Sequence, residues 1–111
     1  MEAKATARGV RVSPYRARLI ATLIRGKKAD EALAILENVN NKASKLTKKV
    51  LDSAIANAVN NESADATTLY IKEARVDAGP TLKRHKFDSR GRIGHKDHRT
   101  SHINIVVATR N

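Results

Sequence analysis

Apolar residues recur at helical spacing through the first half of the chain. Ser13-Pro14 is typical of a helix start, with serine as the N-cap and proline in the first turn. The apolar residues that follow lie three or four positions apart and continue to Ile24. Gly26 is typical of the residue just beyond a helix end. This pattern predicts a first helix between Pro14 and Gly26.

Two more helices are predicted from the same periodicity. Residues 29–37 carry alanines and leucines at helical spacing, with Asp30 and Glu31 in the first turn, where the helix dipole favours acids. The run of asparagines and valine at 38–41 predicts a break. Residues 42–60 then carry one broad apolar stripe, which predicts the longest helix of the chain.

After Thr67 the pattern changes to that of β-strands. A strand is predicted from Leu69 to about Val76, where apolar residues alternate with charges. The clearest strand is 102–107, because its isoleucines and valines share one face. Val10 and Val12 flank Arg11, which predicts a short strand within 2–12.

The segment from about 79 to 102 is almost without apolar residues. A structureless loop of that length is uncommon inside a compact domain, so we predict a long β-hairpin that extends from the body. Gly91 permits a positive φ and places the turn at 89–92. So polar a hairpin has no core of its own and is marginal alone in water, which predicts that a partner orders it.

Composition and charge indicate the class of partner. The 111 residues are typical of one domain, with a body at 1–78 and 103–111. Lysine and arginine number 22 against 11 acids, a net charge of +11, and the basic excess falls in two blocks, 1–28 and 81–102. Such an excess implies a polyanionic partner, most commonly nucleic acid.

Several function classes are excluded or disfavoured. The chain has no cysteine, so disulfides, thiolate metal sites and cysteine nucleophiles are excluded. No apolar run approaches a membrane span, and the first residues lack the apolar segment of a signal peptide, which predicts a cytoplasmic protein without a membrane partner. We find no catalytic constellation and predict no enzyme activity and no cofactor. His95, His98 and His102 lie in a strand-like region where alternate residues face apart, so no metal site is predicted.

The candidate RNA-binding residues are the cations of the two basic blocks. Each one that neutralises a phosphate releases counterions, so affinity should fall steeply with salt. The hairpin block comprises Lys83, Arg84, Lys86, Arg90, Arg92, Lys96 and Arg99. The N-terminal block comprises Arg8, Arg11, Arg16, Arg18, Arg25, Lys27 and Lys28. A stripe of Lys42, Lys45 and Lys49 fits either phosphate contact or an ordinary solvated helix face.

The scarcity of aromatic residues refines the prediction. Proteins that read single-stranded RNA on a sheet stack bases on exposed aromatics, and this chain has only three, all dispersed. We therefore expect recognition of folded RNA through its backbone and shape. The alternatives are a stand-alone basic RNA-binding regulator and, less well supported, a peripheral membrane binder, which would need bulky aromatics beside a basic helix.

Several strings resemble the bacterial type of the large-subunit ribosomal protein twenty-two family. They cover nearly the whole chain in order and are VRVSP at 10–14, RLI at 18–20, LIRGK at 23–27, SAIANA at 53–58, GPTLKR at 79–84 and RTSHI at 99–103. The resemblance implies an α+β fold, in which three helices pack on a small antiparallel three-stranded sheet and a long β-hairpin extends from it.

The resemblance also implies a function and further site residues. The protein would bind large-subunit rRNA on the ribosome, aid assembly beside neighbouring ribosomal proteins, and act as a single copy rather than a homo-oligomer. Thr100, Ser101 and His102 would contact RNA on the return arm. The hairpin tip would line the nascent-peptide exit tunnel and meet the nascent polypeptide. The tip residues are Lys86, Phe87, Asp88, Ser89, Arg90, Gly91, Arg92 and Ile93.

Overall fold

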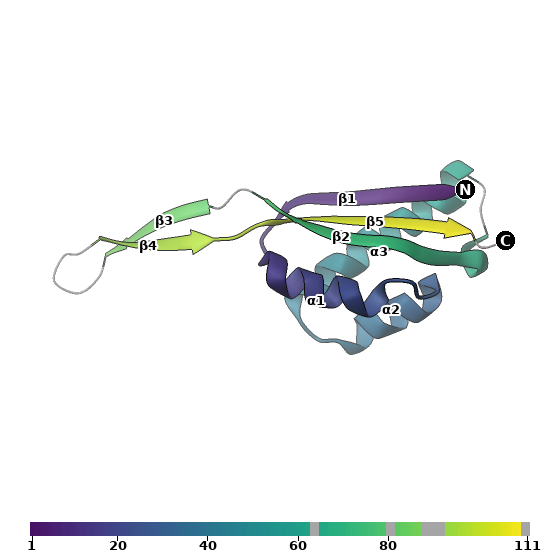
Figure 1. The fold of residues 1–111 in the computed structure, drawn as a ribbon, viewed down its shortest axis with the longest axis horizontal. Coiled ribbons are helices and arrows are strands. Elements are labelled where there is room, and N and C mark those ends of the chain that lie inside the picture. Colours follow the sequence, from purple (N-terminus) through teal and green to yellow (C-terminus); the bar gives the residue numbers. More distant parts are fainter. Residues whose placement is uncertain (63–64, 80–81, 88–92, 110–111) are drawn as a thin grey trace.

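A helix-and-sheet body and a two-stranded arm lie end to end along the molecule (Figure 1). The computed structural model describes residues 1–62, 65–79, 82–87 and 93–109. Its extents are 64 × 25 × 17 Å, so the arm makes the molecule much longer than it is wide. The elements in chain order are β1 (Glu2–Val10), α1 (Pro14–Ile24), α2 (Ala29–Asn38), α3 (Lys42–Glu62), the 3-10 turn η1 (Ala66–Thr68), β2 (Leu69–Ala78), β3 (Leu82–Phe87), β4 (Ile93–His98) and β5 (Ser101–Thr109).

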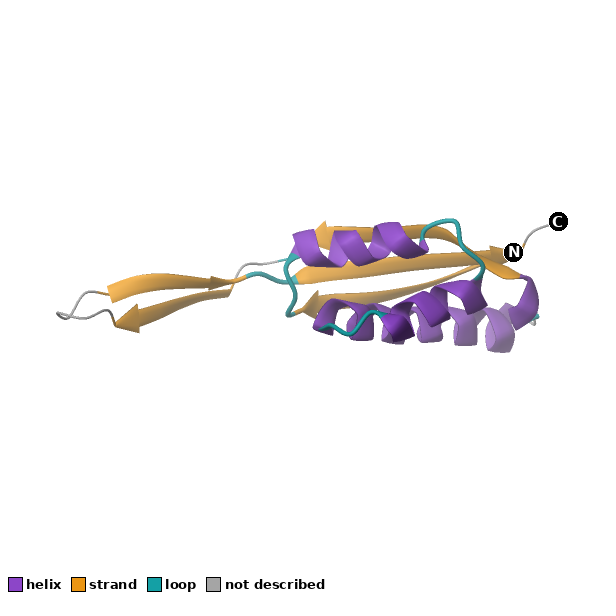
Figure 2. Cartoon of the chain, turned by 90° about the horizontal axis from the view of Figure 1, so that it is seen from below, coloured by secondary structure: helices purple, strands orange, loops and turns teal. Residues whose placement is uncertain are grey.

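The body sheet has the order β1-β5-β2, and both pairings are antiparallel. The last strand is therefore the central one, and it joins the first strand to β2. Along β5, Ile103, Ile105 and Val107 are buried, whereas the alternate residues His102 and Asn104 are only half-buried. The helices pack on the face that carries the buried residues and leave the other face open (Figure 2). The predicted α+β class, with three helices on a three-stranded sheet, is confirmed.

Small residues on the helices let the core pack closely. The buried face of α1 carries Ala17 and Ala21 beside Ile20 and Ile24. On α3 the residues 0 % exposed include Leu51, Ala54 and Ala58. Alanine brings the helix backbone near the sheet, and the large side chains of β5 fill the space between the layers.

The helix boundaries follow the local signals in the sequence. Ser13 caps α1, because its Oγ accepts a hydrogen bond from Arg16 N at 3.3 Å, and Pro14 occupies the first turn. Gly26, just past the end of α1, has a φ of +79°, a conformation that glycine adopts at little cost. The predictions for the three helices are confirmed to within two residues at each end.

Two bulges shift the strand register, which the alternation of apolar and polar residues in the sequence did not predict. The β2–β5 register shifts between Ile71 and Glu73, so the buried positions change from Leu69 and Ile71 to Ala74 and Val76. The β1–β5 register shifts between Ala7 and Val10, where Gly9 has a φ of +67°. The predicted inclusion of Val12 in the first strand is wrong. β1 ends at Val10, and Val12 is buried beyond it.

The arm is an antiparallel pair with a defined register. Leu82 pairs with His98 at its base, and Phe87 pairs with Ile93 at the last step before the tip. The predicted turn at 89–92 lies outside the described residues. β5 begins at Ser101, which pairs with Val10 and Ala78, so Ser101 and His102 belong to the body sheet.

Gly79 sits at a close approach where the arm joins the body. A Cβ at this position would lie 2.5 Å from Thr100 Oγ1, and Gly79 N donates to Thr100 O at 2.9 Å. Thr100 is 4 % exposed and β-branched, so its side chain has little room to rotate away. We expect Gly79→Ala to lower the free energy of unfolding by about 1–3 kcal/mol, the usual cost of overpacking, in urea unfolding followed by circular dichroism.

Thr100→Ala provides the control for this prediction, because it removes the atom nearest to the new Cβ and leaves the looser contact with His102 Cε1 at 3.2 Å. The double variant should cost less than the sum of the two single variants. If the two costs simply add, the contact with Thr100 is not the cause.

Candidate nucleic-acid interface

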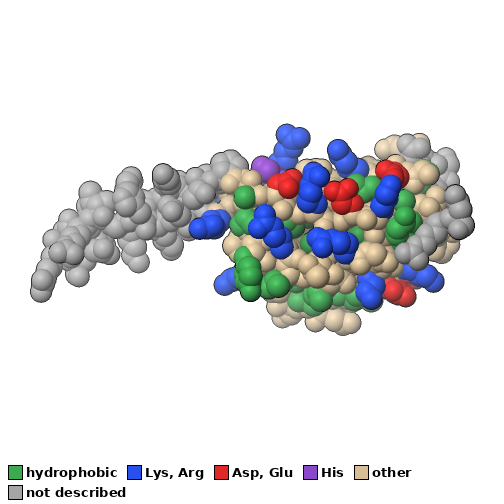
Figure 3. Space-filling view, viewed as in Figure 1, with side chains coloured by type: hydrophobic (Ala, Val, Ile, Leu, Met, Phe, Trp, Pro, Cys, Tyr) green, Lys and Arg blue, Asp and Glu red, His purple; other side chains and the backbone are tan. Residues whose placement is uncertain are grey.

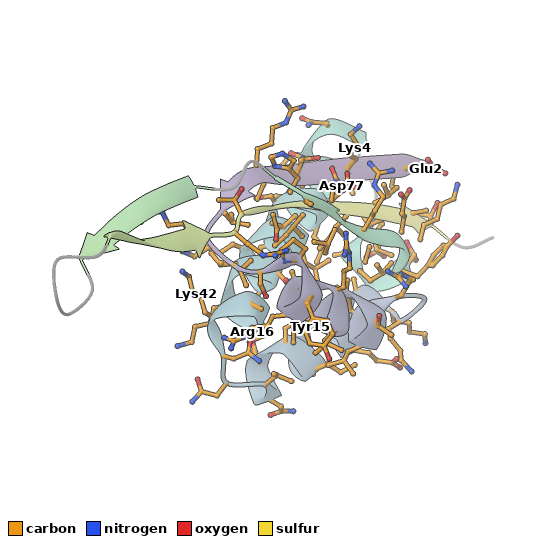
Figure 4. The ribbon with its side chains drawn as sticks, turned by 60° about the vertical axis from the view of Figure 1, so that its left-hand side comes forward. Glu2, Lys4, Tyr15, Arg16, Lys42 and Asp77 are labelled. Atoms are coloured by element: carbon orange, nitrogen blue, oxygen red, sulfur yellow. The ribbon has the colours of Figure 1, made fainter. Side chains whose placement is uncertain are left out.

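Four cations from four segments surround a groove where the arm leaves the body. The groove has a volume of about 870 Å³. Arg11 comes from the β1–α1 connection, Arg16 from the first turn of α1, Lys42 from the start of α3, and Arg99 from the β4–β5 connection. All four are exposed, and no acidic residue is among the described residues that line the groove. Figure 4 shows Arg16 and Lys42 at the end of the body nearest the arm. We call this the hairpin-base groove.

Two helix starts position the groove cations. Ser13 caps α1 and thereby places Arg16 on its first turn. At α3, Asn41 Oδ1 accepts a hydrogen bond from Ser44 N at 2.8 Å, so the helix begins with Lys42 at the groove. Helix N-termini carry partial positive charge, so both helices add to the potential of the four side chains. The groove is thus built to attract anions.

The floor of the groove is apolar and firmly held. Val12 and Ile20 are buried, and Leu19 is 53 % exposed. Ser101 Oγ donates to Val12 O at 2.7 Å, which ties the β1–α1 connection to the central strand. The groove therefore combines an apolar floor with a cationic rim.

Arg18 and Arg25 hold α1 against the exposed edge of the sheet. Arg25 Nη2 and Nε donate to Ala74 O at 2.7 and 3.1 Å, and Arg18 Nε donates to Val76 O at 3.3 Å. β2 is an edge strand, so these carbonyls would otherwise face solvent. Two of the predicted RNA-binding arginines thus have a structural task, and both remain exposed enough to contact a ligand as well.

The segment that carries Lys27 and Lys28 covers the next part of the same edge. Gly26 N donates to Ile71 O at 3.0 Å, and Ile71 N donates to Lys27 O at 2.8 Å. The backbones of Lys28 and Tyr70 form an isolated antiparallel β-bridge. The predicted N-terminal block is therefore divided, with two arginines at the hairpin-base groove and four cations along the β2 edge.

We expect Arg25→Ala to lower the free energy of unfolding by about 1 kcal/mol, because it removes charged donors from a backbone carbonyl. Arg25→Lys keeps the charge but not the two-pronged geometry, so it should recover only part of the loss. Thermal or urea unfolding measures both. Full recovery by lysine would mean that charge alone matters at this position.

The open face of the sheet has mixed charge. Over the strands, basic and acidic side chains alternate in Figure 3. Arg75 lies 3.3 Å from both Glu73 and Asp77, and Lys72 pairs with Glu2. Arg8, the remaining member of the N-terminal block, is exposed on β1. This face has little net charge, whereas the hairpin-base groove and the β2 edge carry the other cations of the N-terminal block.

Three predicted residues of the return arm lie at the junction with the body. Thr100 and Ser101 are buried, and their side chains serve the packing there. His102 Nδ1 accepts a hydrogen bond from Gly9 N at 3.0 Å, which holds the bulge of β1. Their RNA contacts stay predictions.

The arm cations are placed by strand register. Lys83 is opposite Asp97, Arg84 is opposite Lys96, and Lys86 is opposite Gly94. Among the predicted tip residues, Phe87 and Ile93 form the last pair. Asp88, Ser89, Arg90, Gly91 and Arg92 lie outside the described residues.

Ligand chemistry of other kinds has little support in the part of the chain that the structure describes. It contains no group of three histidines or acids placed to hold a metal ion. No helix within it is long and apolar enough to cross a membrane. The pKa of Asp65 is lowered chiefly by the backbone N–H of Thr67 and secondarily by its hydroxyl. That aspartate caps η1 and does not line the hairpin-base groove.

Sequence reasoning left Lys42 undecided and did not select Asn41. The sequence did contain a signal for Lys42. The asparagine-rich segment at 38–41 separates two predicted helices, so Lys42, which follows it directly, was expected at a helix N-terminus. What the sequence did not show is that this helix start lies beside Arg11, Arg16 and Arg99.

A basic α+β body, an extended arm and a groove lined by four cations at the base of the arm characterise a basic α+β protein with a candidate anion site at one end. The chain belongs to the Ribosomal protein L22p/L17e family, whose family model matches residues 5–108. It is therefore a non-enzymatic protein of the large ribosomal subunit, as predicted. The predicted location on the ribosome, in the cytoplasm, follows from the same membership.

The similarity to individual relatives extends over nearly the full chain. Large ribosomal subunit protein uL22 of Halothermothrix orenii is 52% identical over 97% of this chain and 96% of the relative. The protein of the same name from Carboxydothermus hydrogenoformans is 53% identical over 99% of this chain and 97% of its own length. That of Syntrophomonas wolfei is 47% identical over the same shares.

Proposed function

We propose that this protein binds folded large-subunit rRNA with the end of the body from which the arm extends. The observation that carries the proposal is the convergence of Arg11, Arg16, Lys42 and Arg99 on one groove, with no acid among its described lining residues. Phosphates are the anions that RNA presents in quantity, and arginine binds them with two parallel hydrogen bonds.

A second contact surface runs along the β2 edge. The exposed cations there are Arg18, Arg25, Lys27 and Lys28. Arg18 and Arg25 each use part of the guanidinium on a backbone carbonyl, which orients the side chain and leaves further N–H groups to donate. Such pre-oriented arginines lose less entropy on binding a phosphate than free side chains do.

We further propose that the arm enters the RNA and that its tip lines the nascent-peptide exit tunnel. The length of the molecule, 64 Å, supports this, because the arm reaches well beyond the body. A two-stranded arm without a core of its own is marginal in water, so RNA contacts from Lys83, Arg84, Lys86 and Lys96 would stabilise it. Tip residues between Phe87 and Ile93 would then face the nascent chain.

We also propose a role in assembly, which the same geometry supports. A body and an arm that bind separate RNA segments would hold those segments together as the subunit folds, beside neighbouring ribosomal proteins. One copy suffices, since both contact surfaces belong to a single chain. Membership of a ribosomal family favours this function over that of a stand-alone regulator.

Sedimentation of a tagged chain in cell lysate tests the RNA-binding proposal. We expect stoichiometric recovery with large subunits that survives a high-salt wash, because many phosphate contacts and the inserted arm must be released together. Removal by the wash, with most protein in the light fractions, would indicate loose electrostatic adhesion and would contradict the proposal.

A photoreactive residue at Phe87 tests the tunnel proposal separately. In ribosomes stalled with a radiolabelled nascent chain, this position should cross-link to that chain, whereas the same residue at Leu82, at the base of the arm, should not. Cross-links at Leu82 alone, or at neither position in intact ribosomes, would contradict the placement of the tip.

A further inference from the structure

We propose that the hairpin-base groove holds an unpaired nucleotide of the RNA, with the base on the apolar floor and the adjacent phosphates on the cationic rim. This inference rests on the proposed rRNA binding and makes it more specific. In this inference Leu19 contacts the base, and the cations contact the phosphates.

The composition of the groove carries the inference. A surface that contacts only a duplex backbone needs cations and polar groups, because paired bases are stacked inside the duplex. Here the cations share the lining with apolar residues and with the polar Ser13 and Asn41. Val12 and Ile20 are buried at the floor, and Leu19, at 53 % exposed, presents the apolar surface. An apolar surface gains free energy only by contact with an apolar partner, and the face of an unstacked base is the apolar part of RNA.

The size and shape of the groove agree with this ligand. Its volume of about 870 Å³ lies in the range of pockets that hold small molecules, which is the scale of a nucleotide rather than of a helix. The four cations come from four different segments and all line the groove, so the groove offers several donors to the phosphates next to an inserted base.

The exposure of Leu19 supports the same conclusion. Leu19 and Leu23 are one turn apart on α1 and are 53 % and 45 % exposed. Of the two, only Leu19 lines the groove. With few aromatic residues in the chain, this leucine is the large apolar side chain best placed to contact a base. Leu23 therefore provides a matched control, with the same chemistry and a similar exposure.

The experiment places the photoreactive amino acid p-benzoylphenylalanine at Leu19 or at Leu23 in the full chain and assembles each variant into large subunits. Cross-linked nucleotides are mapped by reverse-transcription stops, and their pairing is read by chemical probing of the same subunits. We expect Leu19 to cross-link to an unpaired nucleotide that Leu23 does not reach.

A second measurement compares Leu19→Ser with Leu23→Ser in binding to in vitro transcribed large-subunit rRNA. Because both residues are exposed, both variants should fold, and neither changes the net charge. Leu19→Ser should weaken binding roughly tenfold with an unchanged salt dependence, and Leu23→Ser should have little effect.

Other outcomes overturn the inference. A cross-link from Leu19 to a paired nucleotide or to a protein would show that the floor contacts something else. Equal weakening by the two serine variants, or none, would also overturn it. In each of these cases the chain is still bound to the subunit, so the proposed function stands. A chain that fails to enter the subunit or to bind rRNA would contradict both proposals.

Discussion

Replacing Arg11, Arg16, Lys42 and Arg99 together by glutamine is expected to reduce affinity for large-subunit rRNA by roughly three orders of magnitude at 0.1 M salt. Each phosphate contact contributes about 0.7–0.9 to the slope of log affinity against log salt, so four contacts contribute about three. The steepness of log affinity against log salt should therefore decrease by about three. Filter binding of the transcribed RNA over a salt series measures both quantities.

The control for this prediction changes the net charge equally but elsewhere. Lys4, Lys45, Lys49 and Lys72 are exposed, and none of them lines the hairpin-base groove. Their replacement by glutamine should lower the slope by much less. Equal effects of the two quadruple variants would mean that total charge, or the stripe with Lys45 and Lys49, matters as much as the groove, and the groove would lose its special role.

Ile105→Ala is expected to lower the free energy of unfolding by about 3 kcal/mol or more, a large part of the stability of a domain of this size. Ile105 is 0 % exposed at the centre of β5. Its neighbours across the strands are Ala5 and Ala74, both small. The methyl groups removed would leave a cavity that neither neighbour can fill.

Val106→Ala is the matched control for the core prediction, because Val106 is next in sequence on the opposite face and is only half-buried. It should cost clearly less in urea unfolding followed by circular dichroism. If the two variants were equally stable, the helices would not be packing on the face that carries Ile105.

Local signals were sufficient to predict the helices and the main strands. Ser13, Pro14 and Gly26 act through their immediate neighbours, so the limits of α1 could be inferred from the sequence. The extent of β1 was harder to infer. Its alanines have weak strand preference, and it forms because β5 pairs with it along nearly its whole length.

The candidate site was predictable in composition but not in arrangement. The basic blocks were evident from the residues, and Arg11, Arg16 and Arg99 were selected from them. The roles of Arg18 and Arg25 on the carbonyls of β2 were not evident, because a hydrogen bond across 49 or more positions depends on how α1 packs. The burial of Thr100 and Ser101 likewise follows from the junction of arm and body.

The sequence by itself determined the class of fold, the polyanionic partner and the existence of a polar arm. The class of fold depends on the periodicity of apolar residues, the partner on the net charge, and the arm on the scarcity of apolar residues between 79 and 102. All three are properties of the chain read in order. The tertiary structure alone decided that Lys42 joins cations from three other segments around an apolar floor. Such a groove forms because the first turns of α1 and α3 meet at the end of the sheet, and no local pattern encodes that contact between distant segments.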